Sequence, residues 1–131
     1  MGNHFAILVW SVYMTGRVLL IDDSSISRKM FKANLPPGNY ILDEASGGLE
    51  GLAQYQKNRA DVVFLDLTMP DIDGFETLSR LKALDPQVRV IIQSADVQKS
   101  SKERAFSLGA EDFLQKPLKA DALREHISPW L

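Results

Sequence analysis

The sequence predicts one α/β domain built on a doubly wound, five-stranded parallel sheet. From Arg17 onward, short apolar runs alternate with amphipathic segments, as strands and crossover helices do in parallel sheets. The runs hold consecutive Val, Ile and Leu without polar alternation, which is typical of strands covered on both faces. A chain of 131 residues can bury one core without disulfides or structural metals.

Five strands and five helices are expected in alternation. The strands are expected at residues 18–21, 40–42, 62–65, 88–92 and 112–114. The helices are expected at about 24–35, 48–58, 74–84, 97–108 and 119–127. Prolines end the first and third helices, and Gly109 ends the fourth. Candidate N-caps are Ser24 or Ser25 for the first helix, and Ser94 or Asp96 for the fourth.

The composition excludes several kinds of site. The chain has no cysteine, and its two histidines lie near opposite ends, which argues against disulfides, thiolate metal sites and His-pair zinc sites. The formal net charge is −2 and Lys and Arg form no dense stripe, so direct nucleic-acid binding is not expected. The missing cysteines fit a reducing compartment, and we expect a cytoplasmic protein without a membrane span.

Residues 1–16 form a separate N-terminal extension of uncertain status, and residues 17–131 the globular domain. The extension holds an apolar run from Phe5 to Met14, broken only by Ser11, that is too short to span a bilayer. One interpretation is an upstream extension, with Met14 as an alternative start. The other is an added strand or an association surface.

Polar residues follow four of the five predicted strands. Asp22 and Asp23 end the first strand and Asp66 the third, Ser94 comes after the fourth, and Lys116 after the fifth. The carboxyl ends of parallel strands meet at one edge of a doubly wound sheet, where ligands bind. We therefore expect these side chains to form one site.

The chemistry of this set points to a metal and a phosphoryl group. Three adjacent carboxylates repel one another unless a cation lies between them, and Mg²⁺ prefers oxygen ligands and retained waters. Lys116 and Ser94 suit the oxygens of an acyl phosphate, and an ionised Asp66 can attack phosphorus without a general base. Asp71 and Asp73 are interpreted as turn residues before the third helix.

Four motifs, at residues 19–24, 63–74, 92–95 and 114–117, resemble those of the CheY-like receiver domains of response regulators. The resemblance runs from residue 18 to about 127 and implies a flavodoxin-like fold with strand order 2-1-3-4-5. It also implies a phosphoacceptor signalling domain that promotes only its own phosphorylation and dephosphorylation.

The resemblance assigns the acidic residues. Asp66 corresponds to the phosphoacceptor. Asp23, Asp66 and the backbone carbonyl of Thr68 correspond to direct Mg²⁺ ligands, and Asp22 to a carboxylate that acts largely through a bound water.

It also assigns the residues around the phosphoryl group. Ser94 and Lys116 correspond to residues that bind phosphoryl oxygens, and Pro117 to a proline usually preceded by a cis bond. Phe113 corresponds to an aromatic residue that moves inward together with the hydroxyl residue, although a Phe in an apolar strand is more often simple core.

The implied function is a phosphorylation-activated switch of a two-component system or phosphorelay. The implied partners are a sensor histidine kinase or histidine phosphotransfer protein, and a downstream protein that binds the fourth helix, fifth strand and fifth helix. The domain would act as a monomer or a phosphorylation-dependent dimer. It would work as a stand-alone protein or as part of a longer regulator, and the sequence does not decide between the two.

Two other functions remain open at this point. An enzyme of the haloacid-dehalogenase type also forms an aspartyl phosphate, but Thr68 occupies the position of its second aspartate. A degenerate receiver that binds partners without phosphorylation would need no complete acidic site.

Overall fold

The computed structural model describes residues 15–131 and shows a five-stranded parallel sheet in the order β2-β1-β3-β4-β5. The strands are β1 (Gly16–Ile21), β2 (Tyr40–Ala45), β3 (Val62–Asp66), β4 (Val90–Ser94) and β5 (Asp112–Gln115). The helices are α2 (Ser25–Asn34), α3 (Gly48–Lys57), α4 (Gly74–Leu84), α5 (Lys99–Ser107) and α6 (Ala120–Ile127), followed by a 3-10 turn, η1 (Ser128–Trp130). The predicted flavodoxin-like fold and strand order are confirmed.

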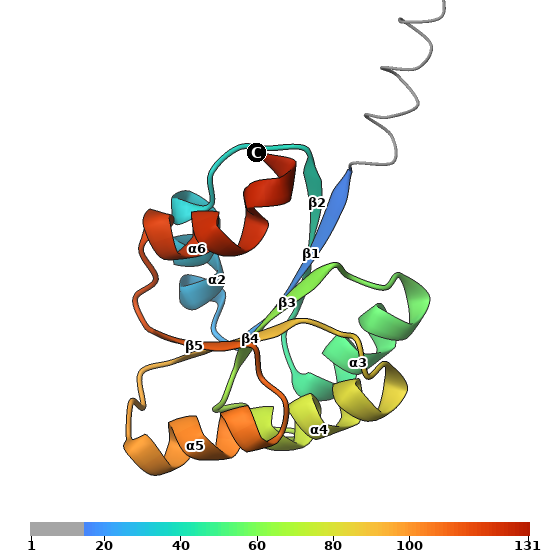
Figure 1. Ribbon diagram of the computed structural model, residues 1–131, viewed down its shortest axis with the longest axis vertical. Helices are drawn as coiled ribbons and strands as arrows, with labels where there is room; N and C mark the ends of the chain where they lie inside the picture. The colour runs from blue at the N-terminus through green and yellow to red at the C-terminus, as the bar shows by residue number, and fades with distance from the viewer. Residues whose placement is uncertain (1–14) are drawn as a thin grey trace, which may run out of the picture.

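Helices cover both faces of the sheet, so the domain has three layers (Figure 1). Alternate strand residues face opposite sides and build two cores. Leu20, Phe64 and Ile91 face α2 and α6, while Ile21, Leu65 and Ile92 face α3, α4 and α5. The central strands β1, β3 and β4 are almost fully buried, as their uninterrupted apolar runs predicted.

The chain order of the strands reverses between β1 and β3. From β1 the chain moves out to the edge strand β2, and then crosses back to pair β3 with the other side of β1. In sheets of this type the carboxyl ends of the strands on either side of the reversal border the ligand site. Asp22 and Asp66 lie at this point.

Every strand differs from its predicted bounds by one to three residues at one end or both. β2 continues through Ala45, which pairs with Ile21, instead of ending at residue 42. β4 begins at Val90 instead of residue 88, because the N–H of Val88 donates to the carbonyl of Asp85 in the preceding turn. Val88 is nevertheless buried, so its apolar side chain marked the core and not the strand.

The two predictions of helix caps had different outcomes. Ser24 caps α2, and its side chain accepts a hydrogen bond from the N–H of Ser27. The N-cap of α5 is Gln98 and not Ser94 or Asp96. Asp96 still contributes to this turn, because its carboxylate accepts from the N–H of Gln98 and the hydroxyl of Ser101.

The apolar run at residues 5–14 lies outside the described residues, so both interpretations of it stay predictions. Within residues 15–131, no helix has the length and apolar character needed to cross a membrane.

Candidate functional site

Three carboxylates converge at the carboxyl ends of β1 and β3. Asp22, Asp23 and Asp66 each offer an oxygen that lies within 4.8 Å of the other two. Asp22 is fully buried and Asp66 is 7% exposed, whereas Asp23 is open to solvent. The sequence prediction that the first and third strands deliver these groups to one point is therefore correct.

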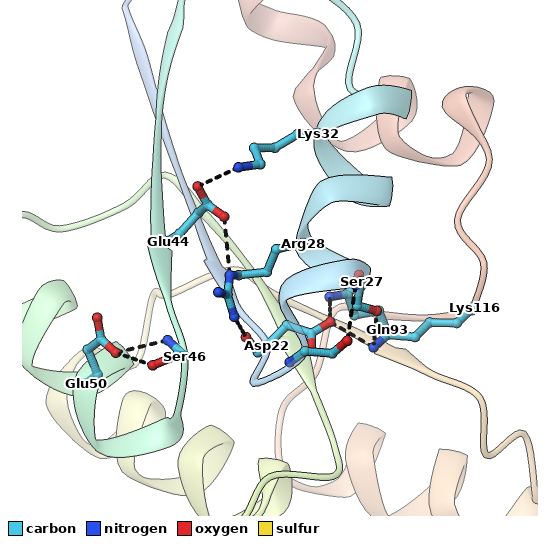
Figure 2. A network of polar contacts seen from close by, with 10 residues as sticks. Asp22, Ser27, Arg28, Lys32, Glu44, Ser46, Glu50, Gln93 and Lys116 are labelled. Carbon is cyan, nitrogen blue, oxygen red and sulfur yellow. Dashed lines mark hydrogen bonds and ion pairs between the residues drawn. The ribbon is translucent and has the colours of Figure 1, made fainter.

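Lys116, from the loop after β5, brings a positive charge to this acidic cluster. Its Nζ lies 2.7 Å from Oδ2 of Asp22 and 3.4 Å from Oδ2 of Asp66. The ammonium also donates to Oγ of Ser27 in the first turn of α2, at 2.9 Å. The peptide bond between Lys116 and Pro117 is cis, as expected. Figure 2 shows Lys116 reaching toward Asp22 and Ser27.

The buried carboxylate of Asp22 is held from several sides. Its Oδ1 accepts from the N–H of Ser24 at 2.9 Å. Its Oδ2 accepts from Lys116, and also from Nε2 of Gln93 at 3.4 Å. The guanidinium of Arg28 donates to its backbone carbonyl at 2.6 Å. The bonds to Oδ1 and Oδ2 offset the cost of removing the carboxylate from water, and the bond from Arg28 fixes the backbone beside it.

The electrostatics of Asp66 combine opposing effects. Burial raises the pKa of the Asp66 carboxyl above its ordinary value, and the nearby charge of Asp22 raises it further. The ammonium of Lys116 and the backbone N–H of Thr68 act to lower this pKa, but burial prevails. The ionised form of Asp66 is therefore costly before another cation arrives.

The carboxylates fit a hard divalent cation. Their oxygens lie close enough together to share one ion, and the exposed side at Asp23 leaves room for the waters that Mg²⁺ retains. The donors are all oxygen, which excludes the soft-ligand pattern of structural zinc.

The fold and this site agree with the comparisons to known proteins. The family model for the response regulator receiver domain matches residues 18–128. This chain belongs to that family. It is a phosphoacceptor signalling domain of two-component systems, which excludes the haloacid-dehalogenase alternative.

Several relatives of this receiver domain are chemotaxis proteins. CheY of Bacillus subtilis (strain 168) is 36% identical over 119 residues, which cover 90% of this chain and 99% of that protein. Hybrid signal transduction histidine kinase F of Dictyostelium discoideum is 32% identical over 121 residues, which cover 88% of this chain and 11% of that protein. Receiver domains thus occur both as nearly whole proteins and as parts of larger kinases.

The solved structures that resemble this chain also include CheY proteins. The CheX-CheY-BeF3-Mg²⁺ complex from Borrelia burgdorferi matches with a TM-score of 0.79 and 30% identity, over 86% of each chain. CheY4 of Vibrio cholerae matches with a TM-score of 0.80 and 28% identity, over 89% of this chain and 99% of that one.

The two predicted switch residues of the receiver domain lie on neighbouring strands. Ser94 is the last residue of β4 and is 2% exposed, and its Oγ accepts from the N–H of Asp96 at 3.0 Å. Phe113 in β5 is half-buried, and Nζ of Lys102 lies 5.9 Å from its ring centroid. Phe113 also packs against the hydrophobic core on the α5 side, so it contributes to the core. Its role as a switch residue stays a prediction.

The loop after Asp66 is fixed by its own carboxylates. Asp71 accepts from the N–H groups of Gly48 and Leu49 at the start of α3, at 3.2 and 2.9 Å. Asp73 caps α4 by accepting from the N–H of Glu76 at 2.9 Å. Both residues thus act in turns and caps, in keeping with their interpretation as turn residues.

Sequence reasoning missed three residues of the site, namely Ser27, Arg28 and Gln93. Ser27 and Arg28 gave no local signal, because one turn of a helix offers many polar side chains. Gln93 did give one: it is a polar residue within the buried strand β4 and is only 2% exposed.

Proposed function

We propose that Asp66 of this receiver domain accepts a phosphoryl group from a phosphohistidine on a sensor histidine kinase or a histidine phosphotransfer protein. The single observation that carries the proposal is the position of Asp66. Its carboxylate ends β3 beside two further carboxylates and 3.4 Å from the ammonium of Lys116.

The transfer needs no general base, because an ionised carboxylate carries no proton. One oxygen of Asp66 forms the new bond to phosphorus while the bond from phosphorus to the imidazole nitrogen breaks, and that nitrogen keeps the electron pair. Lys116 and the hydroxyl of Ser94 bind the oxygens on which negative charge collects. Because burial raises the pKa of Asp66, the ionised nucleophile is held at elevated free energy.

Mg²⁺ is the proposed cofactor. Asp23, Asp66 and the backbone carbonyl of Thr68 would hold it directly, and Asp22 largely through water. Bound there, the ion would neutralise negative charge on the phosphoryl oxygens. The CheY of Borrelia burgdorferi, 30% identical in sequence, has been solved with BeF3 and Mg²⁺, which supports this assignment.

The proposed output is a change at the surface of α5, β5 and α6, where a downstream protein of a cytoplasmic pathway would bind. Ser94 ends β4, and Phe113 follows on the adjacent strand, where it pairs with Ile92. A movement of the Ser94 hydroxyl toward the phosphoryl group would thus affect β5, which belongs to this surface and pairs with β4. The solved complex of CheX with the Borrelia burgdorferi CheY is in keeping with a protein as the target.

The test is phosphorylation with a small donor. The purified chain is incubated with Mg²⁺ and acetyl phosphate, and the phosphorylated species is detected by intact mass. We expect it to form in the wild type and to be lost in Asp66→Asn and in the presence of EDTA. The matched control is Asp73→Asn, which alters an aspartate of the same loop at a cap that Asn also fills well.

The result also decides between this function and that of a degenerate receiver. If the wild type takes up neither acetyl phosphate nor beryllofluoride, Asp66 is not a phosphoacceptor. Labelling of Asp66→Asn at the wild-type level would place the phosphoryl group on another residue.

A further inference from the structure

Gln93 places an uncharged amide inside the acidic site. It lies in β4 one residue before Ser94, is 2% exposed, and is the Cα partner of Asp66 in the β3–β4 ladder. Ile91, two residues earlier, packs in the core under α2 and α6. Since alternate side chains of a strand share a face, Gln93 points to the side of the sheet that holds Asp22.

The amide shares an acceptor with Lys116. Nε2 of Gln93 lies 3.4 Å from Oδ2 of Asp22, and Nζ of Lys116 lies 2.7 Å from the same oxygen (Figure 2). The first distance is at the long end of the hydrogen-bonding range and the second is short for a charged pair. In this state Lys116 is the stronger partner and Gln93 the weaker one.

This order changes if Lys116 moves away from Asp22 toward a phosphoryl oxygen. Its ammonium has three N–H groups, and here it donates to Asp22 and Ser27 and lies 3.4 Å from Asp66. A shift toward a phosphoryl group on Asp66 weakens the bond to Asp22. Because Asp22 is fully buried, a lost donor is costly unless another group replaces it.

We propose that Gln93 is a positioning residue of this site. When Lys116 turns to the phosphoryl group, the Gln93 amide becomes the main hydrogen-bond donor to Oδ2 of Asp22 and keeps this carboxylate in place. The inference rests on the proposed function, because it needs Asp66 to carry the phosphoryl group. Gln93 then stabilises the phosphorylated form more than the unphosphorylated form.

The experiment compares two binding steps in wild type and in Gln93→Met, which is similar in size but has no donor. Calorimetry first measures Mg²⁺ binding alone, and then beryllofluoride binding at saturating Mg²⁺. We expect Mg²⁺ affinity to change less than about twofold, because Ser24 and Lys116 still hold Asp22. Beryllofluoride affinity should fall about tenfold, the size expected for a lost hydrogen bond to a buried charge.

Two further variants keep the test decisive. Gln93→Asn serves if Gln93→Met does not fold. Its side chain keeps the polarity of the site but is one methylene too short to reach Asp22, so it should also lose beryllofluoride affinity. Gln87→Met is the matched control, because the Gln87 side chain is exposed on the turn before β4 and the change should leave both affinities unaltered.

A spectroscopic signature separates positioning from a merely structural role. In the wild type, beryllofluoride should shift the side-chain amide proton of Gln93 downfield, as its bond to Asp22 shortens. Equal beryllofluoride affinities in wild type and Gln93→Met, equal losses at both binding steps, or an unmoved amide resonance would each overturn the role of Gln93. If the wild type binds no beryllofluoride, the phosphoacceptor proposal itself fails and this inference falls with it.

Discussion

Lys116 pairs more closely with Asp22 than with Asp66. Its ammonium lies 2.7 Å from the fully buried carboxylate of Asp22, and 3.4 Å from that of the proposed phosphoacceptor. Before phosphorylation the lysine thus serves chiefly as the counter-ion of a proposed metal-binding residue. Phosphoryl binding and the integrity of the acidic cluster therefore depend on the same side chain.

Replacing Lys116 by Met should destabilise the protein most strongly when no divalent cation is present. The change leaves Asp22 buried without its counter-charge, so we expect the free energy of unfolding to fall by about 2 kcal/mol in EDTA. Mg²⁺ should recover much of this loss, because the ion supplies positive charge at the same cluster. Urea denaturation with EDTA and with Mg²⁺ measures both values.

The control for this prediction is Lys119→Met, which removes an exposed charge three residues along the chain. It should change the free energy of unfolding by less than about 0.5 kcal/mol under both conditions. Equal losses in the two lysine variants would show that net charge, and not the contact with Asp22, is responsible.

Asp66→Asn should stabilise the metal-free protein at neutral pH. Burial raises the pKa of Asp66, so the folded state binds this proton more tightly than the unfolded chain does. Stability therefore rises as the pH falls through the raised pKa, and above it the ionised carboxylate is a cost. We expect Asn to remove this cost near pH 7, so that Asp66→Asn unfolds at a higher denaturant concentration than the wild type.

The advantage of Asp66→Asn should shrink as the pH falls toward the ordinary range of carboxyl groups, where the wild-type residue is protonated in the folded state. Thermal or urea unfolding in EDTA across this range measures the difference, with Asp73→Asn as the control. A difference that stays constant with pH would mean that the ionisation of Asp66 is not its cause.

Gly74→Ala should disturb the loop that follows Asp66. A Cβ at this position would meet the carbonyl oxygen of Asp66 and the Cα of Leu67, and backbone atoms cannot move aside as a flexible side chain can. We expect a loss of about 2 kcal/mol in the free energy of unfolding and slower labelling by acetyl phosphate. Ser79→Ala, on the exposed side of the same helix, should leave both unchanged.

The sequence was most informative where chain order alone decides position. Asp22 and Asp66 follow the buried apolar runs of β1 and β3. Parallel strands bring their carboxyl ends to one edge of the sheet, and this placement does not depend on side-chain conformation. Lys116 could be placed at the same edge for the same reason. Its distances to the two carboxylates could not, because they depend on rotamers and on the turn at Pro117.

The length of β2 could not be read from local pattern. Asp43 and Glu44 interrupt its apolar run, yet both lie within the strand. Nη1 of Arg17 lies 2.6 Å from Oδ2 of Asp43, and Nζ of Lys32 lies 3.1 Å from Oε2 of Glu44. Cations from β1 and α2 thus compensate these negative charges at the edge of the sheet. Contacts with residues distant in sequence thus override the low strand preference of acidic side chains.

Asp71→Ala should loosen the start of α3 and so release one anchor of the loop after Asp66. The carboxylate of Asp71 accepts from the first N–H groups of that helix, which have no partner within the helix itself. We expect the free energy of unfolding to fall by about 1 kcal/mol at neutral pH. The amides of Gly48 and Leu49 should also exchange faster with solvent, which hydrogen exchange followed by NMR measures directly.

This effect should depend on pH in the sense opposite to that of Asp66. Hydrogen bonds from the backbone N–H groups lower the pKa of Asp71, led by the bond from Leu49. The stabilisation is therefore present above the ordinary carboxyl pKa and is lost as the pH falls through the lowered value. Asp71→Asn keeps a neutral acceptor and should show a smaller loss with little pH dependence, whereas equal losses in the Ala and Asn variants at neutral pH would contradict a charge-assisted cap.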